Sequence, residues 1–308
     1  MARIQWKSSK TLYKLNVRNL LLIIVLFVLT SLSFDQPPPL FINKNNNEHF
    51  DYIRGKKQHI VTEGKGNPTV IFVSGKGRTL DDFITVFNKI KKRTRIFAYD
   101  RAGLGQSESL NNERTVDTMA YELNELLIQE KIEPPFILEG HSMGAFIIRC
   151  FENMYPKKVA GLVFIDAACE LDFKKGIEMR SESDKIKYRR GFDSLINVPT
   201  RPKGINDESK YLFDFDKEYY STNSKIVKGL KIPNNIPITA FVSTQIENDN
   251  PYSKNEKEIR LNYFKSWKNQ APQVRLIETS KSGHCIQCDE PNLIIEGITE
   301  MVNEIKNK

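Results

Sequence analysis

The chain has 308 residues, of which 40% are hydrophobic and 27% charged, and its net charge is +8. This composition excludes a wholly disordered, collagen-like or multi-pass membrane protein, and the length fits one large α/β domain or two small domains. Five basic residues precede the first acidic residue, Asp35, and account for most of the positive excess. A nucleic acid is therefore not an expected partner.

Residues 1–34 are predicted to be an N-terminal signal anchor or signal peptide. Leu20 to Phe34 carries no charge and follows basic residues, but as a helix it spans only about 22 Å, less than a typical ~30 Å hydrocarbon core. A retained anchor is favoured, with its basic end in the cytoplasm and the catalytic domain outside, on a single-pass membrane protein. A cleaved signal peptide would instead give a secreted protein, although the only cleavage-like site, Ser31-Leu32-Ser33, is poor. A buried core helix is disfavoured because the segment has no polar face.

Beyond a polar linker at residues 35–48, residues 49–308 alternate between strand-like and helix-like patterns. Short apolar runs indicate buried strands, and apolar residues at helical spacing indicate amphipathic helices. Repeated strand–helix units predict the α/β class, with a mostly parallel sheet flanked by helices. The predicted strands are 69–74, 94–99, 136–139, 159–165, 238–243 and 274–277; the predicted helices are 80–92, 115–130, 144–153 and one from about 291.

Residues 169–235 interrupt this alternation. They are polar and charged, with weak apolar periodicity and several Pro and Gly residues. A structureless loop of that length is uncommon in a compact domain. The segment is therefore predicted to be an inserted, mostly helical cap.

The chain has four cysteines: Cys150, Cys169, Cys285 and Cys288. The last two have the spacing of a zinc or redox motif. Zinc would need a second pair of ligands, and no other Cys pair or His cluster is spaced for it. A disulfide or a packing role is favoured, and neither a metal nor a cofactor is expected.

The pattern Gly140-His141-Ser142-Met143-Gly144 indicates a nucleophile. This G-x-S-x-G sequence lies between a predicted strand and a predicted helix, which is the context that the motif requires. A sharp strand-to-helix turn exposes the serine hydroxyl, and the flanking glycines allow the backbone to pack closely. The alternative is an incidental serine in a turn.

A serine nucleophile needs a base, and four histidines are available. His49 and His59 precede the first core strand, in the linker or an edge hairpin. His141 adjoins Ser142, and neighbouring side chains on such a turn diverge. His284 remains, on a loop between a strand and the last helix, and is favoured as general base over a simple surface histidine; the order Ser then His matches a hydrolase arrangement.

The acid that orients the imidazole has three candidates. Asp166 ends the predicted strand 159–165, whereas Glu247 and Asp249 lie in the loop after strand 238–243, where Ile246 stands at the position usually acidic. Asp166 is favoured, with Glu247 as the first alternative. A strand-end aspartate that only caps a neighbouring loop is the other reading of Asp166.

An oxyanion hole needs two backbone N–H donors. Met143, at the start of the helix after the nucleophile, is expected to supply one. Lys76, in the turn Ser74-Gly75-Lys76-Gly77, is expected to supply the second. The Lys76 side chain either stays in solvent or favours an anionic group on the substrate.

Several motifs together resemble the α/β-hydrolase superfamily over about residues 60–307. They are VIFVSGKG, YDRAGLGQS, LEGHSMG, VAGLVFIDAA and SGHCIQCDEP. The resemblance implies Ser142 as nucleophile and His284 as base. Pancreatic-type lipases take their acid after the strand that follows the nucleophile helix, which corresponds to Asp166 here.

The sequence also departs from the superfamily pattern. The usual His-Gly of the oxyanion turn is Ser74-Gly75, and the usual late aspartate is absent, which leaves the acid open. Asp100-Arg101 is expected to brace loops near the site. Gly103-x-Gly105 is not a dinucleotide-binding fingerprint, because the third glycine and the βαβ setting are missing.

The sequence therefore predicts a serine hydrolase that cleaves carboxylic esters, including lipid or acylglycerol esters, through an acyl-enzyme on Ser142. A serine argues against dehalogenase or epoxide-hydrolase chemistry, for which the superfamily uses an aspartate. An amidase, peptidase or acyltransferase would use the same triad. The alternative from another class is a catalytically silent hydrolase fold that serves as a binding protein.

Overall fold

The structure, a computed structural model, describes residues 48–110, 114–171, 181–183, 222–246 and 253–308. The predicted N-terminal segment, all but the last residue of the predicted linker and most of the predicted cap lie outside these residues. In the described part of the chain, no helix has both the length and the apolar character needed to cross a membrane. Residues 44–308 form a compact unit of their own.

Eight strands of the described residues form one sheet in the order β1-β2-β4-β3-β5-β6-β7-β8. The first two form an antiparallel hairpin at one edge, and β2 is also antiparallel to β4. All remaining neighbours are parallel, so the carboxyl ends of β3 to β8 share one edge of the sheet. The strands are β1 Glu48–Ile53, β2 Lys56–Glu63, β3 Thr69–Val73, β4 Ile96–Tyr99, β5 Phe136–His141, β6 Val159–Ile165, β7 Ile238–Ser243 and β8 Val274–Thr279.

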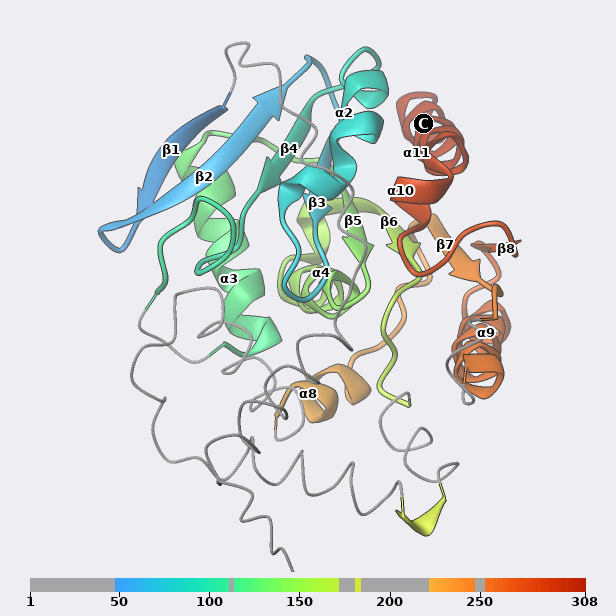
Figure 1. Cartoon of the computed structure of the whole chain (residues 1–308). Coiled ribbons are helices and arrows are strands. Elements are labelled where there is room, and N and C mark those ends of the chain that lie inside the picture. The colour runs from blue at the N-terminus through green and yellow to red at the C-terminus, as the bar shows by residue number, and fades with distance from the viewer. Residues whose placement is uncertain (1–47, 111–113, 172–180, 184–221, 247–252) are drawn as a thin grey trace, which may run out of the picture. The chain divides into compact units, whose positions relative to one another are not determined.

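Helices cover both faces of the sheet (Figure 1). Those of the first face are η1 Leu80–Phe83, α2 Ile84–Ile90, α10 Ile286–Asp289 and α11 Pro291–Lys306. Those of the second face are α3 Val116–Gln129, α4 Gly144–Met154, α8 Ser224–Lys228 and α9 Ser253–Gln270. The short η2 Pro156–Lys158 leads from α4 into β6.

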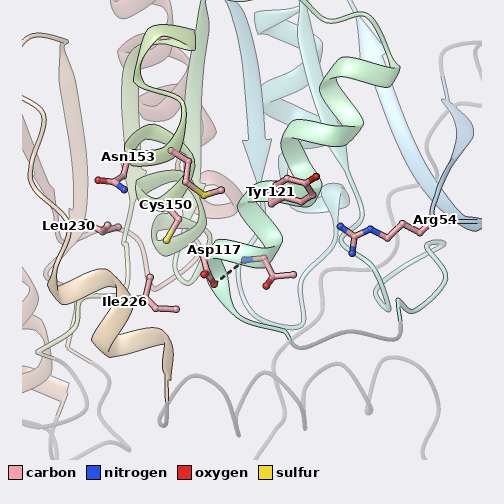
Figure 2. A pocket seen from close by; sticks show the side chains of 9 residues that line it. Arg54, Asp117, Tyr121, Cys150, Asn153, Ile226 and Leu230 are labelled. Carbon is pink, nitrogen blue, oxygen red and sulfur yellow. Dashed lines mark hydrogen bonds between the residues drawn. The ribbon is translucent and has the colours of Figure 1, made fainter.

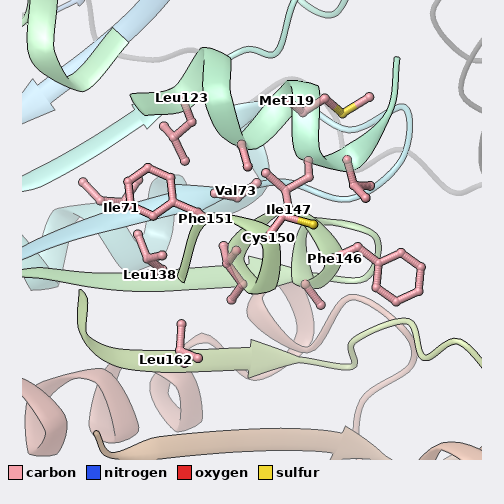
Figure 3. Close-up of a cluster of buried hydrophobic side chains, with 14 of the residues drawn as sticks. Ile71, Val73, Met119, Leu123, Leu138, Phe146, Ile147, Cys150, Phe151 and Leu162 are labelled. Atoms are coloured by element: carbon pink, nitrogen blue, oxygen red, sulfur yellow. The ribbon is translucent and has the colours of Figure 1, made fainter. Parts of the chain in front are cut away.

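Alternating strand residues pack against these two layers. Ile71 and Val73 of β3 belong to the apolar cluster formed with α3 and α4 (Figure 3). Phe72, between them, packs on the other side against Phe83 and Phe87, with ring centroids 5.3 and 4.7 Å apart. Both faces of a central strand are therefore buried, which explains its uninterrupted apolar sequence.

The predicted α/β-hydrolase fold is confirmed, and each predicted strand and helix lies within two or three residues of an observed one, the helix at 80–92 beginning with the 3-10 turn η1. The edge hairpin offered as one location for His49 and His59 is present, and it begins at Glu48, the last residue of the predicted linker. Helix α9 was not predicted. Its sequence is rich in charged and polar residues, and its apolar contacts come from Tyr263, Phe264 and Trp267.

Candidate active site

Ser142 lies on a tight turn between β5 and α4. Its φ of +51° is in the left-handed region, which a side chain rarely adopts without support. A Cβ on Gly144 would lie 2.2 Å from the carbonyl oxygen of Val73, and one on Gly140 would lie 2.8 Å from the amide nitrogen of Ala145. Both glycines are therefore required by close backbone packing, which holds the serine at the carboxyl edge of the sheet.

Asp166 occupies the matching position at the end of β6. Strands β5 and β6 are parallel neighbours, with His141 opposite Ile165. Ser142 and Asp166, which directly follow these two strands, therefore lie at the same carboxyl edge of the sheet. The Ser142 amide donates to the Ile165 carbonyl at 3.0 Å, and the Asp166 amide donates to the Phe241 carbonyl at 2.8 Å. Asp166 has a φ of +35°, so both strand ends carry a non-glycine residue in the left-handed region.

His284 joins these two residues from the loop between β8 and α10. Its Nε2 lies 2.9 Å from the Ser142 Oγ, and its Nδ1 lies 2.6 Å from the Asp166 Oδ2. A carboxylate only accepts, so Nδ1 donates to Asp166, and Nε2 is the ring nitrogen that faces the serine hydroxyl. The structure thus brings together Ser142, His284 and Asp166; Glu247 and Asp249, the alternative acids, lie outside the described residues.

Two cationic side chains from α9 contact the same carboxylate. Arg260 donates to Asp166 Oδ2 at 2.7 Å and Lys257 donates at 3.3 Å, while the Ser243 amide donates to Oδ1 at 3.0 Å. Burial on its own raises the pKa of Asp166, but Arg260, His284 and Lys257 outweigh it and hold that pKa well below its ordinary value. The carboxyl group is therefore ionised, although it is fully buried.

His141 supports the loop that carries His284. Its Nε2 donates to the His284 carbonyl oxygen at 3.0 Å, and the two rings lie 4.8 Å apart between centroids. Burial, together with the nearby His284, lowers the pKa of His141 to about 3, so its ring is neutral at physiological pH. This supporting role was missed by the sequence analysis, which considered only whether His141 reaches Ser142.

The turn after β3 lies beside the nucleophile. A Cβ on Gly75 would come within 3.2 Å of the Ser142 Cβ. The buried Arg101 fixes this turn by donating to the Ser74 carbonyl at 2.5 Å and to the Gly75 carbonyl. Lys76 follows in the same turn, so its backbone is placed next to the site.

Asp100 braces the neighbouring loops. Its two oxygens accept from the Leu80 and Gln106 amides, each at 3.0 Å, and His59 lies 2.8 Å away. The bracing role expected for Asp100-Arg101 is thus confirmed. Met143 is the first residue before α4, where backbone N–H groups have no intrahelical acceptor. The two backbone segments expected to supply oxyanion donors therefore flank Ser142.

A disulfide joins Cys285 and Cys288, directly after His284. The Arg78 guanidinium lies 3.8 Å from the Cys285 Sγ. Cys150 and Cys169 are both buried. Across the described residues, no group of His, Cys, Asp and Glu is arranged to hold a metal ion. Of the two roles favoured for the C-x-x-C pair, the disulfide is the one observed.

A cavity of about 590 Å³ opens on the outer side of α3 and α4 (Figure 2). Helix α8 and the β1–β2 turn complete its wall, and its lining includes none of the three residues Ser142, Asp166 and His284. The cavity is therefore separate from the candidate active site. It is lined by Arg54, Asp117, Thr118, Tyr121, Cys150, Asn153, Met154, Ile226 and Leu230.

Comparison with known proteins agrees with the fold. A family model described as the alpha/beta hydrolase fold matches residues 68–195. The solved structures of similar fold include the epoxide hydrolase CorEH, with a TM-score of 0.60 and 16% identity over 84% of this chain and 99% of that one. They also include a thermophilic esterase from Thermogutta terrifontis, with a TM-score of 0.58 and 17% identity over 84% and 99%. The chain therefore has the α/β-hydrolase fold.

At the level of sequence, the chain is similar to the protein YbdG of Bacillus subtilis. The two are 25% identical over 286 residues, which is 82% of this chain and 85% of YbdG. The similarity therefore extends well beyond the segment matched by the family model.

Proposed function

We propose that this chain is a serine hydrolase that cleaves carboxylic esters through an acyl-enzyme on Ser142. One observation carries the proposal: the contiguous chain from the Ser142 Oγ through His284 to Asp166, with separations of 2.9 and 2.6 Å. Nucleophile, base and orienting acid within hydrogen-bond reach of one another form the arrangement that activates a hydroxyl group.

The reaction follows from this geometry. His284 Nε2 takes the proton of Ser142 Oγ as that oxygen attacks the carbonyl carbon of the ester. Asp166 stays ionised, accepts the hydrogen bond from Nδ1–H and stabilises the positive ring. The oxyanion that forms accepts hydrogen bonds from the Met143 and Lys76 amides, each worth about 3 kcal/mol to the transition state. The intermediate then collapses, the ester C–O bond breaks, and His284 gives its proton to the leaving oxygen, which departs as the alcohol.

Water completes the cycle. His284, neutral again, takes a proton from a water molecule as the water oxygen attacks the acyl carbonyl. The second oxyanion uses the same donors, and its collapse releases the carboxylic acid and restores the Ser142 hydroxyl. Base assistance of this kind contributes about 10²–10⁴-fold to each half of the reaction.

The residue at the turn separates this activity from that of the epoxide hydrolases of the same fold, which use an aspartate there. Attack by a serine alkoxide on a carbonyl gives an acyl-enzyme that water can hydrolyse, whereas an aspartate forms an ester with a ring-opened epoxide. Ser142 therefore favours an ester over an epoxide.

We further propose lipid esters as a substrate class and a membrane as the location. The uncharged run Leu20 to Phe34, preceded by basic residues, supports a single-pass anchor with the catalytic domain outside the cytoplasm. Such an anchor would hold the site near acylglycerols, and the predicted cap at 169–235 would set the acyl-chain preference. Fractionation of cells tests the location: the chain should be recovered with membranes, whereas a free secreted form that begins near Phe34 would identify a cleaved signal.

A panel of p-nitrophenyl esters, from acetate to palmitate, tests the activity. We expect hydrolysis by the wild type and a loss of at least about 10³-fold in Ser142→Ala. Ser266→Ala, at an exposed serine on α9, serves as the matched control and should retain full activity. Ester hydrolysis that survives Ser142→Ala, or a folded protein without activity on any member of the panel, would contradict the proposal; the second result would favour the silent binding protein.

A further inference from the structure

The acid of the candidate triad contacts two cationic side chains in addition to His284. Asp166 accepts from His284, and its same oxygen also accepts from Arg260 at 2.7 Å and from Lys257 at 3.3 Å. The Asp166 side chain is 0% exposed, and those of Arg260 and Lys257 are 15% and 10% exposed. The three charges thus form one largely buried cluster directly behind the imidazole.

The position of both cations on α9 is fixed by the core. Lys257, Arg260, Phe264 and Trp267 are spaced three, four and three residues apart, so they share one face of the helix. Phe264 and Trp267 pack against Phe164 of β6, with ring centroids 5.8 and 5.1 Å apart. Because Asp166 ends that same strand, anchoring this face of α9 on β6 aims the two cations at its carboxylate.

We propose that Lys257 and Arg260 are positioning residues that keep Asp166 ionised and directed at His284 Nδ1, an inference that rests on the proposed serine-hydrolase function. A protonated Asp166 would no longer offer a carboxylate to accept the hydrogen bond from Nδ1–H. The imidazole would then lose the orientation and the tautomer that leave Nε2 available for Ser142.

Burial is the physical reason that the cations are needed. A carboxylate removed from water strongly disfavours its charged form unless opposite charge or hydrogen bonds compensate. The Ser243 amide supplies one hydrogen bond at 3.0 Å. The Nδ1–H of His284 supplies a second at 2.6 Å, and Arg260 and Lys257 supply formal opposite charge.

The role predicts a specific dependence on pH. The charged or titratable groups around Asp166 are Arg260 and Lys257 from α9, His284 from the β8–α10 loop and the neutral His141 from β5. Removing a cation makes protonation of the buried Asp166 easier, because Arg260 and Lys257 are among the groups that lower its pKa. The ionised form of Asp166 that the reaction needs is then lost at higher pH, so the acidic limb of kcat/KM moves upward.

The experiment compares Arg260→Gln with Lys265→Gln in the full-length chain, with kcat/KM on a p-nitrophenyl ester measured from pH 5 to 9. We expect the acidic limb of Arg260→Gln to move up by about one pH unit, which is a tenfold loss on that limb. Arg260→Lys should restore most of the wild-type profile. Lys265→Gln removes an exposed cation of the same helix that pairs with Glu278 at 3.6 Å, and should leave the profile unchanged.

An unchanged acidic limb in folded Arg260→Gln, or an equal loss of activity at every pH, would overturn the proposal. If Arg260→Gln does not fold, Lys257→Gln takes its place with the same expectations. Measuring Ser142→Ala in the same assay distinguishes a failure of this inference from a failure of the proposed serine-hydrolase function. Hydrolysis that does not depend on Ser142 rejects the serine hydrolase itself, whereas Ser142-dependent hydrolysis with an unmoved acidic limb rejects only the role of the two cations.

Discussion

Ser142 and Asp166 end neighbouring strands and both have a positive φ, yet the protein holds them by different means. The Ser142 turn is fixed by backbone contacts, with Gly140 and Gly144 giving space where any Cβ would clash. Asp166 is fixed by side chains, chiefly the long cations of α9.

The difference matches what each residue has to do. A nucleophile must have its oxygen placed within a fraction of an ångström of the substrate carbon, which short-range backbone packing achieves. A buried acid must above all remain charged, which the cationic side chains achieve by direct contact with the carboxylate, at 2.7 and 3.3 Å. We expect the Ser142 turn to be sensitive to volume and the Asp166 cluster to be sensitive to charge.

The largest expected effect on activity comes from removing the charge of Asp166. Asp166→Asn keeps the shape but removes the charge and offers an amide to His284, so we expect kcat to fall by about 10³–10⁴-fold with the fold retained. Steady-state kinetics with circular dichroism as a check on folding measures this, with Asp117→Asn, an exposed aspartate of α3, as the control. A similar loss in Glu247→Gln together with an active Asp166→Asn would assign the acid to the other loop.

Gly144→Ala tests whether the Ser142 turn is sensitive to added side-chain volume. The added Cβ would lie 2.2 Å from the Val73 carbonyl oxygen. We expect about 1–3 kcal/mol of destabilisation and about a 10²-fold lower kcat/KM, because the turn must shift. Gly229→Ala is the control, since its nearest contact would be an ordinary 3.6 Å. Urea unfolding and steady-state kinetics of both variants measure the difference between them. A Gly144→Ala enzyme as stable and as active as the wild type would show that the Ser142 turn is not sensitive to added volume.

Burial of His141 makes the stability of the folded protein depend on pH. Its pKa is lowered by burial to about 3 in the folded state, against an ordinary 6.5. Below pH 6.5 the unfolded chain takes up a proton that the folded chain does not, so stability falls as the pH falls toward 3. Between pH 7 and 5 this amounts to about 2 kcal/mol.

His141→Gln should remove that part of the pH dependence, as measured by urea unfolding at pH 7 and 5. His49→Gln is the control, because its ring is 42% exposed. Equal pH dependence in the wild type and His141→Gln would show that the buried ring does not carry the effect.

The smallest effect is expected for the disulfide next to His284. Cys285 and Cys288 are three positions apart, so the closed loop is short and its closure entropy is worth at most about 2 kcal/mol. A dithiol reductant should lower the urea midpoint of the wild type to that of Cys285→Ser/Cys288→Ser, and should not affect the double variant. A midpoint that reductant leaves unchanged would contradict the stabilising role.

The two regions also differ in how far the sequence predicted them. The G-x-S-x-G pattern has glycines at the two positions where close backbone packing leaves no space for a Cβ. Together with the surrounding strand and helix patterns, it predicted the Ser142 turn. His284 followed by exclusion of the other three histidines. The structure brings the two side chains to 2.9 Å of each other, and their roles as nucleophile and base stay predictions.

Asp166 was left open among three acids because its selection depends on contacts between distant segments. Lys257 and Arg260 were not predicted at all, since charged residues at helical spacing usually indicate a solvent-exposed face. The only signal was their continuity with Phe264 and Trp267 along one helix face. It becomes informative only when β6 is known to lie beneath that face.

Covalent labelling tests the central claim most directly. The wild type is incubated with a fluorophosphonate, and the adduct is mapped by mass spectrometry of peptides. We expect a single phosphonyl adduct on Ser142, greatly slowed in His284→Ala and absent in Ser142→Ala. A folded wild-type protein that acquires no adduct, or one labelled at another residue, would contradict the account.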